Sequence, residues 1–256
     1  MKARALLTVV LAAVLSTTAV SATTAAIPPA RTSAGPAASA PADVLNLTNW
    51  KITLPIGSDG KPTEVKQPAL DSYAKNPYFV VQGKGVRFRA PVNGVTTSGS
   101  SYPRSELREM TDSGSRTASW SSTSGTHTLI VDEAITHLPA RKPHLVAAQI
   151  HDADDDLSVF RLEGSKLYVT NGNTPHHKLI TSTYTLGRRF RAKYVVGGGQ
   201  IKAYFNGVLI TTISKRFSGG YFKAGAYTQA NCDNSSPCAS TNYGETLVYA
   251  VTVRHT

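Results

Sequence analysis

The chain has 256 residues and a formal net charge of +11, from 27 Lys and Arg against 16 Asp and Glu. A basic balance favours an anionic partner such as an acidic polysaccharide, nucleic acid or a cell surface, although solubility alone would give the same charge. After the N-terminal region no stretch is long and apolar enough to cross a bilayer, which excludes a later membrane span.

The first 26 residues have the layout of a secretory signal peptide. Lys2 and Arg4 precede an apolar run over residues 5–20, and small residues follow. A membrane anchor is the alternative, but the run is short for a span and is diluted by Ser16, Thr17 and Thr18. We therefore predict a secreted, extracellular protein whose signal peptide ends after Ala22 or Ala26. Loss of the two basic residues would lower the net charge to +9.

The next segment, residues 27–43, consists mostly of Ala, Pro, Ser and Thr, and only Arg31 and Asp43 are charged. It has no periodicity and little bulk to bury, so it is predicted to be a linker or pro-region. Residues 44–256 remain for one globular domain, and they contain no internal repeat.

This domain is predicted to be all-β. Its segments rich in Val, Ile, Thr, Tyr and Phe alternate with turn signals, of which Asn206-Gly207 is the strongest for a hairpin. No window has a sustained helical period, although a short helix is possible at 68–74. The expected strands are 50–54, 78–81, 86–90, 105–110, 126–136, 145–151, 157–163, 166–170, 178–185, 190–196, 201–205, 208–213, 221–229 and 245–253. Many short strands indicate a jelly-roll sandwich of two antiparallel sheets.

The segment 104–109 could hold a carboxylate-binding group. In a strand, Arg104, Glu106 and Arg108 share one face, since successive side chains point to opposite sides. A surface ladder of ion pairs would explain the pattern and would contribute little to stability. The functional interpretation is that Glu106 fixes the two guanidinium groups so that they can bind a carboxylate in a bidentate manner.

A second candidate segment places Gln149 and His151 on one strand face. A lone histidine is more often structural, but here an amide donor lies two residues from a group that titrates near neutrality. The acidic run from Asp152 to Asp156 is interpreted as a solvated turn, because it lacks the Gly and Glu of a calcium loop.

The remaining histidines have no partner pattern and are expected at surface or loop positions. They are His127, His137, His144, His176, His177 and His255. The adjacent pair at 176–177 could be mistaken for a metal site, but no third ligand is evident.

Two further strands alternate cationic and apolar residues. Arg189, Arg191 and Lys193 share one face of the first, and Lys202 and Tyr204 share a face of the second. A solvated outer sheet surface explains each pattern best. Several such faces on one sheet would instead form a groove suited to a polyanion.

The most informative strand is 221–229, where Tyr221, Lys223, Tyr227 and Gln229 share a face and the opposite face is mostly apolar. Such a polar face is expected to meet solvent or a ligand. Just beyond it lie Cys232 and Cys238, which at this spacing in an exported protein predict a small disulfide-closed loop rather than a metal or redox site.

Three of these segments together resemble polysaccharide lyase family 7, the alginate lyases. The hallmarks of that family are R-(S/T)-E-(L/V)-R, Q-(I/V)-H and Y-F-K-A-G-x-Y-x-Q, and the chain has them intact and in order at 104–108, 149–151 and 221–229. Residues 49–56 also resemble the family's first strand. The resemblance covers the chain from about residue 46 to its end.

The resemblance implies a jelly roll with a concave cationic cleft and β-elimination at a uronic acid, without a metal or cofactor. Arg104 and Gln149 would neutralise the C6 carboxylate, His151 would remove the C5 proton, and Tyr227 would protonate the leaving oxygen at C4. The implied substrate-binding neighbours are Glu106, Arg108, Lys223 and Gln229.

The resemblance also implies an anionic polysaccharide substrate, alginate. A monomer is the default for a secreted depolymerase, no recognised motif supports nucleic-acid binding, and no membrane partner is expected. Family members with Ile at the position of Ile150 tend to accept guluronate, so we expect a guluronate or mixed preference, and we expect endolytic cleavage. In guluronate the C5 proton and the C4 oxygen lie on opposite faces, which suits a separate base and acid. In mannuronate they share a face, and Tyr227 could serve both roles.

Two other classes of protein would also fit a basic sandwich. A glycoside hydrolase needs two carboxylates flanking the bond, but the adjacent Asp132 and Glu133 face opposite ways and Glu106 lies between arginines. A non-catalytic module that binds acidic polysaccharide could use the same cationic face. It would bind the polymer without forming an unsaturated product.

Overall fold

A computed structural model describes residues 39–256, together with Met1. The predicted signal peptide and residues 27–38 of the predicted linker lie outside the described residues. A 3-10 helix, η1 (Pro41–Asp43), precedes the first strand, and Ala40 is buried, so the folded part begins a few residues before the predicted start at residue 44. None of the helices in the described part of the chain is long and apolar enough to span a membrane.

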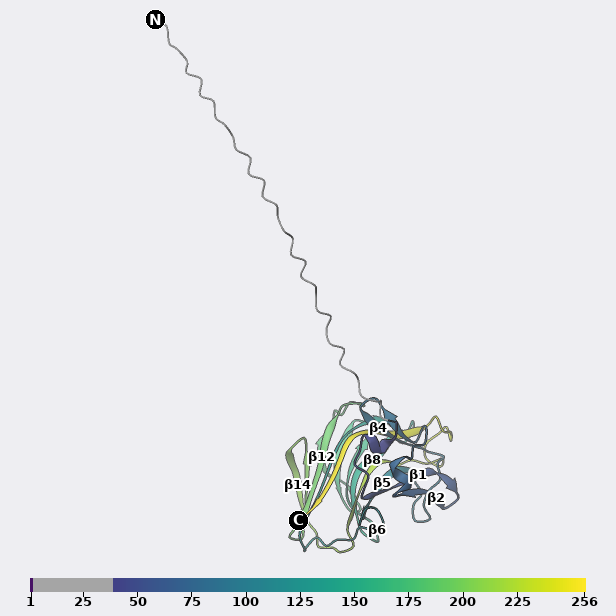
Figure 1. Cartoon of the computed structure of the whole chain (residues 1–256), viewed down its shortest axis with the longest axis vertical. Coiled ribbons are helices and arrows are strands. Elements are labelled where there is room, and N and C mark those ends of the chain that lie inside the picture. Colours follow the sequence, from purple (N-terminus) through teal and green to yellow (C-terminus); the bar gives the residue numbers. More distant parts are fainter. Residues whose placement is uncertain (2–38) are drawn as a thin grey trace, which may run out of the picture. The chain divides into compact units, whose positions relative to one another are not determined.

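Two antiparallel sheets form the domain, which confirms the predicted all-β sandwich (Figure 1). The first sheet has the order β11 (Thr174–Thr181), β10 (Lys166–Asn171), β9 (Asp156–Glu163), β8 (His144–His151), β15 (Tyr221–Thr228), β5 (Arg104–Thr111), β1 (Trp50–Ser58) and β2 (Lys61–Lys66), and β6 (Arg116–Thr117) pairs with β5. The second has the order β14 (Val208–Ser214), β13 (Gln200–Phe205), β12 (Phe190–Gly197), β7 (Thr126–His137), β16 (Tyr243–His255), β4 (Gly85–Pro91) and β3 (Phe79–Gln82).

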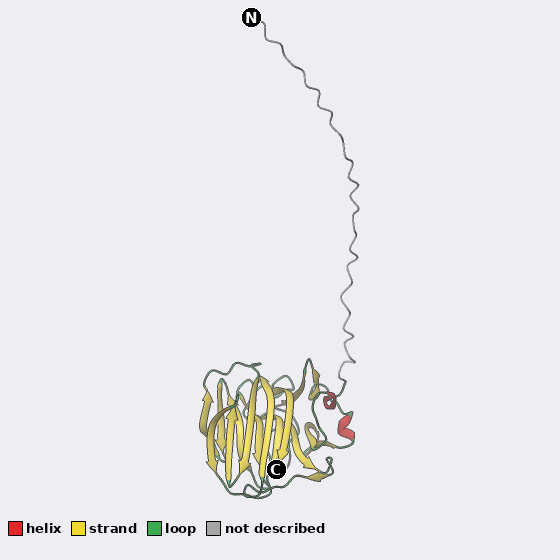
Figure 2. Ribbon diagram, turned by 60° about the vertical axis from the view of Figure 1, so that its left-hand side comes forward, coloured by secondary structure: helices red, strands yellow, loops and turns green. Residues whose placement is uncertain are grey.

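Strands make up most of the domain (Figure 2), and the core lies between the two sheets because the central strands turn their apolar faces inward. Leu107, Ile150 and Phe222 come from the first sheet and Phe88 and Tyr194 from the second, and all five are fully buried. Burial of this apolar surface is the main favourable term in folding. The same alternation leaves the opposite faces of β5, β8 and β15 free for polar side chains.

The sequence pattern failed at the two edge strands of the first sheet. It did not predict β2, whose residues are mostly polar and partly exposed, and it placed β11 four residues too late, at 178–185. These two strands bury little surface, so their apolar periodicity is weak. The edge strands of the second sheet, β3 and β14, were predicted to within one residue. The possible helix at 68–74 is a 3-10 turn, η2 (Ala69–Asp71).

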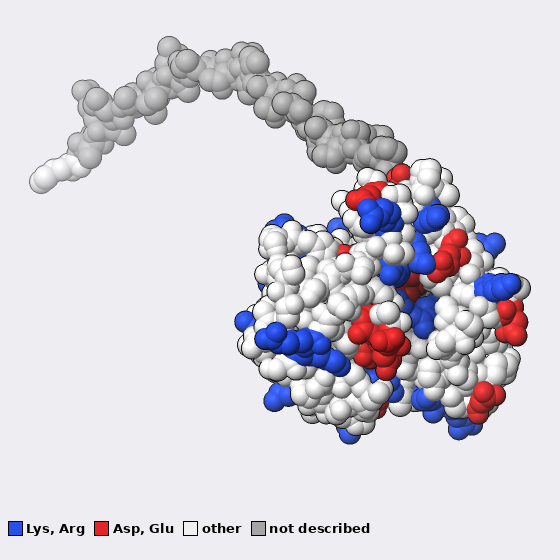
Figure 3. All heavy atoms as spheres, turned by 90° about the horizontal axis from the view of Figure 1, so that it is seen from below, with Lys and Arg blue, Asp and Glu red and all other residues white. Residues whose placement is uncertain are grey.

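The cationic strand face at 189–193 belongs to the second sheet, whereas the three motif segments lie in the first. Phe190, Ala192 and Tyr194 are buried while Arg189 and Arg191 are exposed, which supports the solvated-surface interpretation. On the face in Figure 3, Lys and Arg side chains lie among Asp and Glu side chains and form no continuous basic surface.

Glu133 is a buried acidic side chain without a hydrogen-bond partner among the described residues. It lies on β7 and is fully buried. Burial, with a smaller contribution from the charge of Asp132, raises the pKa of Glu133 to about 8. The folded protein therefore holds this carboxyl in its neutral form at neutral pH.

We predict that Glu133→Gln makes stability less sensitive to pH. A raised folded-state pKa means that the contribution of Glu133 to stability is fully present below the ordinary Glu value and falls by about 1.4 kcal/mol per pH unit up to about pH 8. The amide does not titrate. Between pH 5 and pH 8 the free energy of unfolding of the variant, measured by denaturant titration, should therefore fall less than that of the wild type. Asp59→Asn, in an exposed turn, is the control. A difference in free energy of unfolding between Glu133→Gln and the wild type that is the same at pH 5 and pH 8 would contradict the prediction.

Candidate active site

The three motif segments are neighbouring strands at the centre of the first sheet. β15 lies between β8 and β5, and Lys223 is paired with Gln149 on one side and Arg108 on the other. Along the same strand, Tyr221 is opposite His151 and Tyr227 is opposite Arg104. Residues that are more than 100 positions apart in the chain thereby share one surface.

A β-bulge interrupts β15 between its two tyrosines. The register with β8 shifts between Ala224 and Tyr227, and Gly225 has φ of 135°. A Cβ at this position would lie 2.6 Å from the carbonyl oxygen of Ser105 and 2.8 Å from the ring of Phe88. Only glycine fits this backbone and this space, which explains the glycine in the motif.

Glu106 is the buried centre of the site. Its side chain is fully buried and contacts Lys223 Nζ at 2.7 Å and Arg104 Nη1 at 3.2 Å, and it accepts a hydrogen bond from the amide of Gln149. Burial alone would raise the pKa of Glu106, but the charges of Lys223 and Arg104 outweigh it and hold the pKa below its usual range. The carboxylate therefore stays ionised and orients three other side chains.

Lys223 is the more readily titrated partner of this ion pair. Burial, reinforced by the charges of Arg104 and Arg108, lowers the pKa of Lys223 to about 8, although Glu106 acts in the opposite direction. The ammonium group is therefore charged at neutral pH and loses its proton in mildly alkaline solution.

Arg104 retains free donors beyond its bond to Glu106. Its guanidinium lies 3.9 Å from the centre of the Tyr227 ring, which is a cation–π contact. Its Nε is buried and has no hydrogen-bond partner among the described residues. A buried donor without a partner costs free energy. Because this nitrogen has no access to solvent, a molecule in the cavity would be bound by the other N–H groups of the guanidinium.

His151 has a defined tautomer. Its Nδ1 lies 2.6 Å from the carbonyl oxygen of Asp152, and because a carbonyl can only accept, Nδ1 carries the hydrogen. Nε2 makes no hydrogen bond to a described residue and keeps its lone pair. Burial is the main reason that the pKa of His151 is lowered, so the ring is neutral at neutral pH.

Tyr221 supports this histidine from the adjacent strand. The two rings stack with centroids 5.3 Å apart, and Arg108 covers the ring of Tyr221 at 4.0 Å. Arg108 donates to the backbone carbonyl of Glu109 and does not contact Glu106. The prediction that Glu106 holds both arginines is therefore wrong for Arg108, because Lys223 takes that position.

Tyr227 lies at the other end of the site. Its hydroxyl is 2.8 Å from the hydroxyl of Ser100, and its ring meets that of Tyr102 edge to face at 6.5 Å. Tyr102 in turn accepts a hydrogen bond from Lys142. None of these three neighbours has a sequence signal, because each lies in a loop outside the motifs.

Most of these side chains, but not Glu106 or Tyr102, line a cavity of about 350 Å³. Arg104, Gln149, His151 and Tyr227 all line it, with Arg108, Lys223 and Tyr221. Lys51 and Glu64 extend the lining on β1 and β2, and Asp154, Asp155 and Asp156 form one rim. The predicted cationic cleft is thus cationic on its floor and acidic at this rim. Gln229 does not line the cavity, and its side chain is bonded to Arg161.

A second cluster of titratable side chains lies elsewhere, around a cavity of about 630 Å³. Contrary to the surface position predicted for it, His127 is buried, stacks on Trp120 and meets the Nδ1 of His255 at 2.7 Å. His255 also bonds to the buried Glu109, which accepts hydrogen bonds from the Trp120 indole and the backbone N–H of Phe222 in β15. Local sequence could not reveal this cluster, since its members are far apart in the chain.

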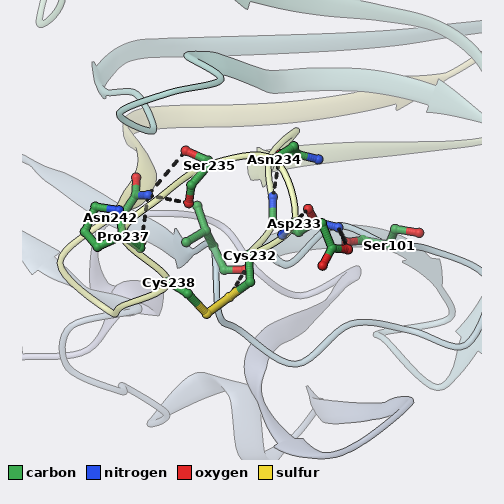
Figure 4. Close-up of a disulfide and its surroundings, with 10 residues drawn as sticks. Ser101, Cys232, Asp233, Asn234, Ser235, Pro237, Cys238 and Asn242 are labelled. Carbon is green, nitrogen blue, oxygen red and sulfur yellow. Dashed lines mark hydrogen bonds between the residues drawn. A yellow bond between two sulfur atoms is a disulfide. The ribbon is translucent and has the colours of Figure 1, made fainter.

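The predicted disulfide between Cys232 and Cys238 is confirmed (Figure 4). It closes a loop that follows β15. Asn242 fixes this loop by donating to the backbone carbonyls of Ser235 and Pro237. The loop also contacts the segment before β5, because Asn231 donates to the carbonyl of Ser101.

Comparison with known proteins agrees with this architecture. The family profile described as alginate lyase matches residues 45–255. The crystal structure of an alginate lyase from Corynebacterium sp. is 64% identical, with a TM-score of 0.84 over 85% of this chain and 99% of that chain. AlgAT5, an alginate lyase of polysaccharide lyase family 7, is 50% identical, with a TM-score of 0.81 over 85% of this chain and 99% of its own.

A curated alginate lyase from Klebsiella pneumoniae is 38% identical over 76 residues. That match spans 28% of this chain and only 25% of the relative, so it adds a local likeness. The family profile covers nearly all of the folded domain, and the solved structures agree with it along almost their whole length. The chain belongs to the alginate lyases of polysaccharide lyase family 7.

Proposed function

We propose that this protein is a secreted alginate lyase that cleaves the 1,4-linked uronate polymer by β-elimination. The observation that carries the proposal is that Arg104, Gln149, His151 and Tyr227, from three strands, line one cavity. A related structure, a variant of alginate lyase A1-II′ that is 27% identical, is described as a complex with substrate GGMG, which supports an oligouronate ligand for this fold.

The first requirement of the reaction is to make the C5 proton acidic. That proton is adjacent to the C6 carboxylate, whose negative charge opposes its removal. The guanidinium of Arg104 and the second N–H of Gln149 can both donate to this carboxylate. As the proton leaves, charge develops on the carboxylate oxygens, and fixed donors stabilise it without reorganisation.

His151 is the proposed base and Tyr227 the proposed acid. The lone pair on Nε2 of the neutral ring removes the C5 proton, and the Nδ1 bond to Asp152 supports the imidazolium that forms. The electrons of the C5–H bond form the C4–C5 double bond while the C4–O bond breaks. The phenol of Tyr227 gives its proton to the leaving oxygen.

Glu106, Lys223 and Arg108 have supporting roles in this proposal. Glu106 is too enclosed by its partners to act as a nucleophile, and it fixes Arg104 and Gln149. Lys223 and Arg108 supply positive charge to the floor of the cavity and so attract a polyanion. We further propose a monomer that acts endolytically on guluronate or mixed sequences.

We predict that Tyr227→Phe and His151→Ala each remove most lyase activity. Loss of a general acid or base should lower kcat by about 10²- to 10⁴-fold, followed as ultraviolet absorbance of the new double bond. Binding of oligoguluronate, measured by calorimetry, should change little. Tyr204→Phe, on the second sheet, is the matched control. A wild type that binds alginate but gives no absorbance would favour the non-catalytic module instead.

The pH dependence of activity should reflect the two shifted groups. Because burial lowers the pKa of His151, the base should remain neutral to below pH 6.5, and the acidic limb of kcat/KM should lie below that value. Because the pKa of Lys223 is about 8, KM for the polymer should rise above that pH as the ammonium loses its charge. An acidic limb above pH 6.5 would contradict the assignment of His151.

The block preference can be tested with separate guluronate-rich and mannuronate-rich polymers. Placement of the base and the acid on two different side chains favours guluronate, in which the two reacting groups lie on opposite faces of the ring. We expect faster cleavage of polyguluronate, with products of intermediate size early in the reaction. Efficient cleavage of polymannuronate with polyguluronate left intact would rule this preference out.

A further inference from the structure

Ser100 is the residue whose side chain reaches the proposed acid most directly from outside the motifs. It lies in the segment between β4 and β5 and lines the same cavity as Tyr227. Its Oγ is 2.8 Å from the phenol oxygen, the usual distance for a hydrogen bond between two hydroxyl groups. No motif of the sequence includes this serine.

The segment that carries Ser100 is held from several directions. The N–H of Ser100 donates to the carbonyl of Thr97, and the N–H of Val95 donates to the carbonyl of Pro55 in β1. The carbonyl of Ser101 accepts a hydrogen bond from Asn231, beside the disulfide-closed loop (Figure 4). The segment that follows β15 therefore holds the backbone next to Ser100, whose hydroxyl contacts Tyr227 of β15.

The hydroxyl of Ser100 has one hydrogen to donate and two choices of acceptor. It accepts from the N–H of Tyr102 at 3.1 Å and can donate either to the carbonyl of Tyr102 at 3.2 Å or to Tyr227 at 2.8 Å. If Ser100 donates to the carbonyl of Tyr102, the phenol of Tyr227 must donate its proton to Ser100, and this proton then points away from a substrate. If it donates to Tyr227, the phenol proton is free.

We propose that Ser100 is a positioning residue for proton transfer by Tyr227, an inference that rests on the proposed function. When Ser100 donates to the phenol oxygen, the phenol proton points into the cavity. Tyr227 then passes this proton to the leaving oxygen as the C4–O bond breaks, and the C5 proton goes to His151. The phenolate that remains keeps the Ser100 hydrogen bond and the Arg104 guanidinium on its ring, until water returns a proton to it.

Ser100→Ala tests this role. Loss of a hydrogen bond to a charged oxygen should lower kcat by about 10- to 100-fold with KM within about twofold of the wild type. A fall in kcat at nearly constant KM, restored by a variant that retains the hydroxyl, distinguishes this role from a merely structural defect. Ser100→Thr retains a hydroxyl and should keep at least a third of kcat. Ser101→Ala, an exposed neighbour that contacts Asn231 through its backbone, should match the wild type.

The inference is overturned if Ser100→Ala keeps kcat within about threefold of the wild type, or if Ser100→Thr is as slow as Ser100→Ala. Thermal unfolding of each variant separates a loss of fold from a loss of the hydroxyl. Tyr227→Phe is measured in the same series. If it is inactive while Ser100→Ala is unaffected, only the role of Ser100 fails, whereas an active Tyr227→Phe would overturn the proposed function itself.

Discussion

The arrangement of the site depends on a single buried carboxylate. Glu106 has no access to solvent, and an isolated charge there would be strongly unfavourable. It is tolerated because Lys223, Arg104 and Gln149 surround it, each from a different position on three adjacent strands. The same contacts that compensate this charge fix the direction of the groups that face the cavity. Stability and preorganisation are therefore coupled at this residue, and a change to any of its partners affects both.

The sheet supplies the second constraint. An antiparallel register places Lys223 between Gln149 and Arg108, and a shift by one residue would send all of these side chains into the core. The bulge at Gly225 adds one residue between Lys223 and Tyr227 and brings the backbone against Ser105 and Phe88. The glycine in the motif is thus a packing requirement as much as a conformational one.

Much of the fold could be predicted from the sequence, because buried strands have a strong two-residue period. The central strands, the sandwich and the disulfide followed from alternation, turn residues and cysteine spacing. The partner of a charged residue could not be predicted this way. Glu106 has two arginines as local neighbours, yet its closest cation is Lys223, more than 100 residues later. The contacts of the buried His127 with His255 and of the Ser100 hydroxyl with Tyr227 could not be predicted for the same reason, since each joins residues more than 100 positions apart in the chain.

The contact of His255 with Glu109 has a practical consequence. The residue next to the C-terminus is bonded to a carboxylate that also holds the backbone of Phe222, directly behind the side chains of Tyr221 and Lys223. Trimming the last two residues, or attaching a bulky fusion partner there, would leave that acid one donor short beneath the central strand. For expression and immobilisation of this protein, His255 should therefore be kept and left free to contact Glu109.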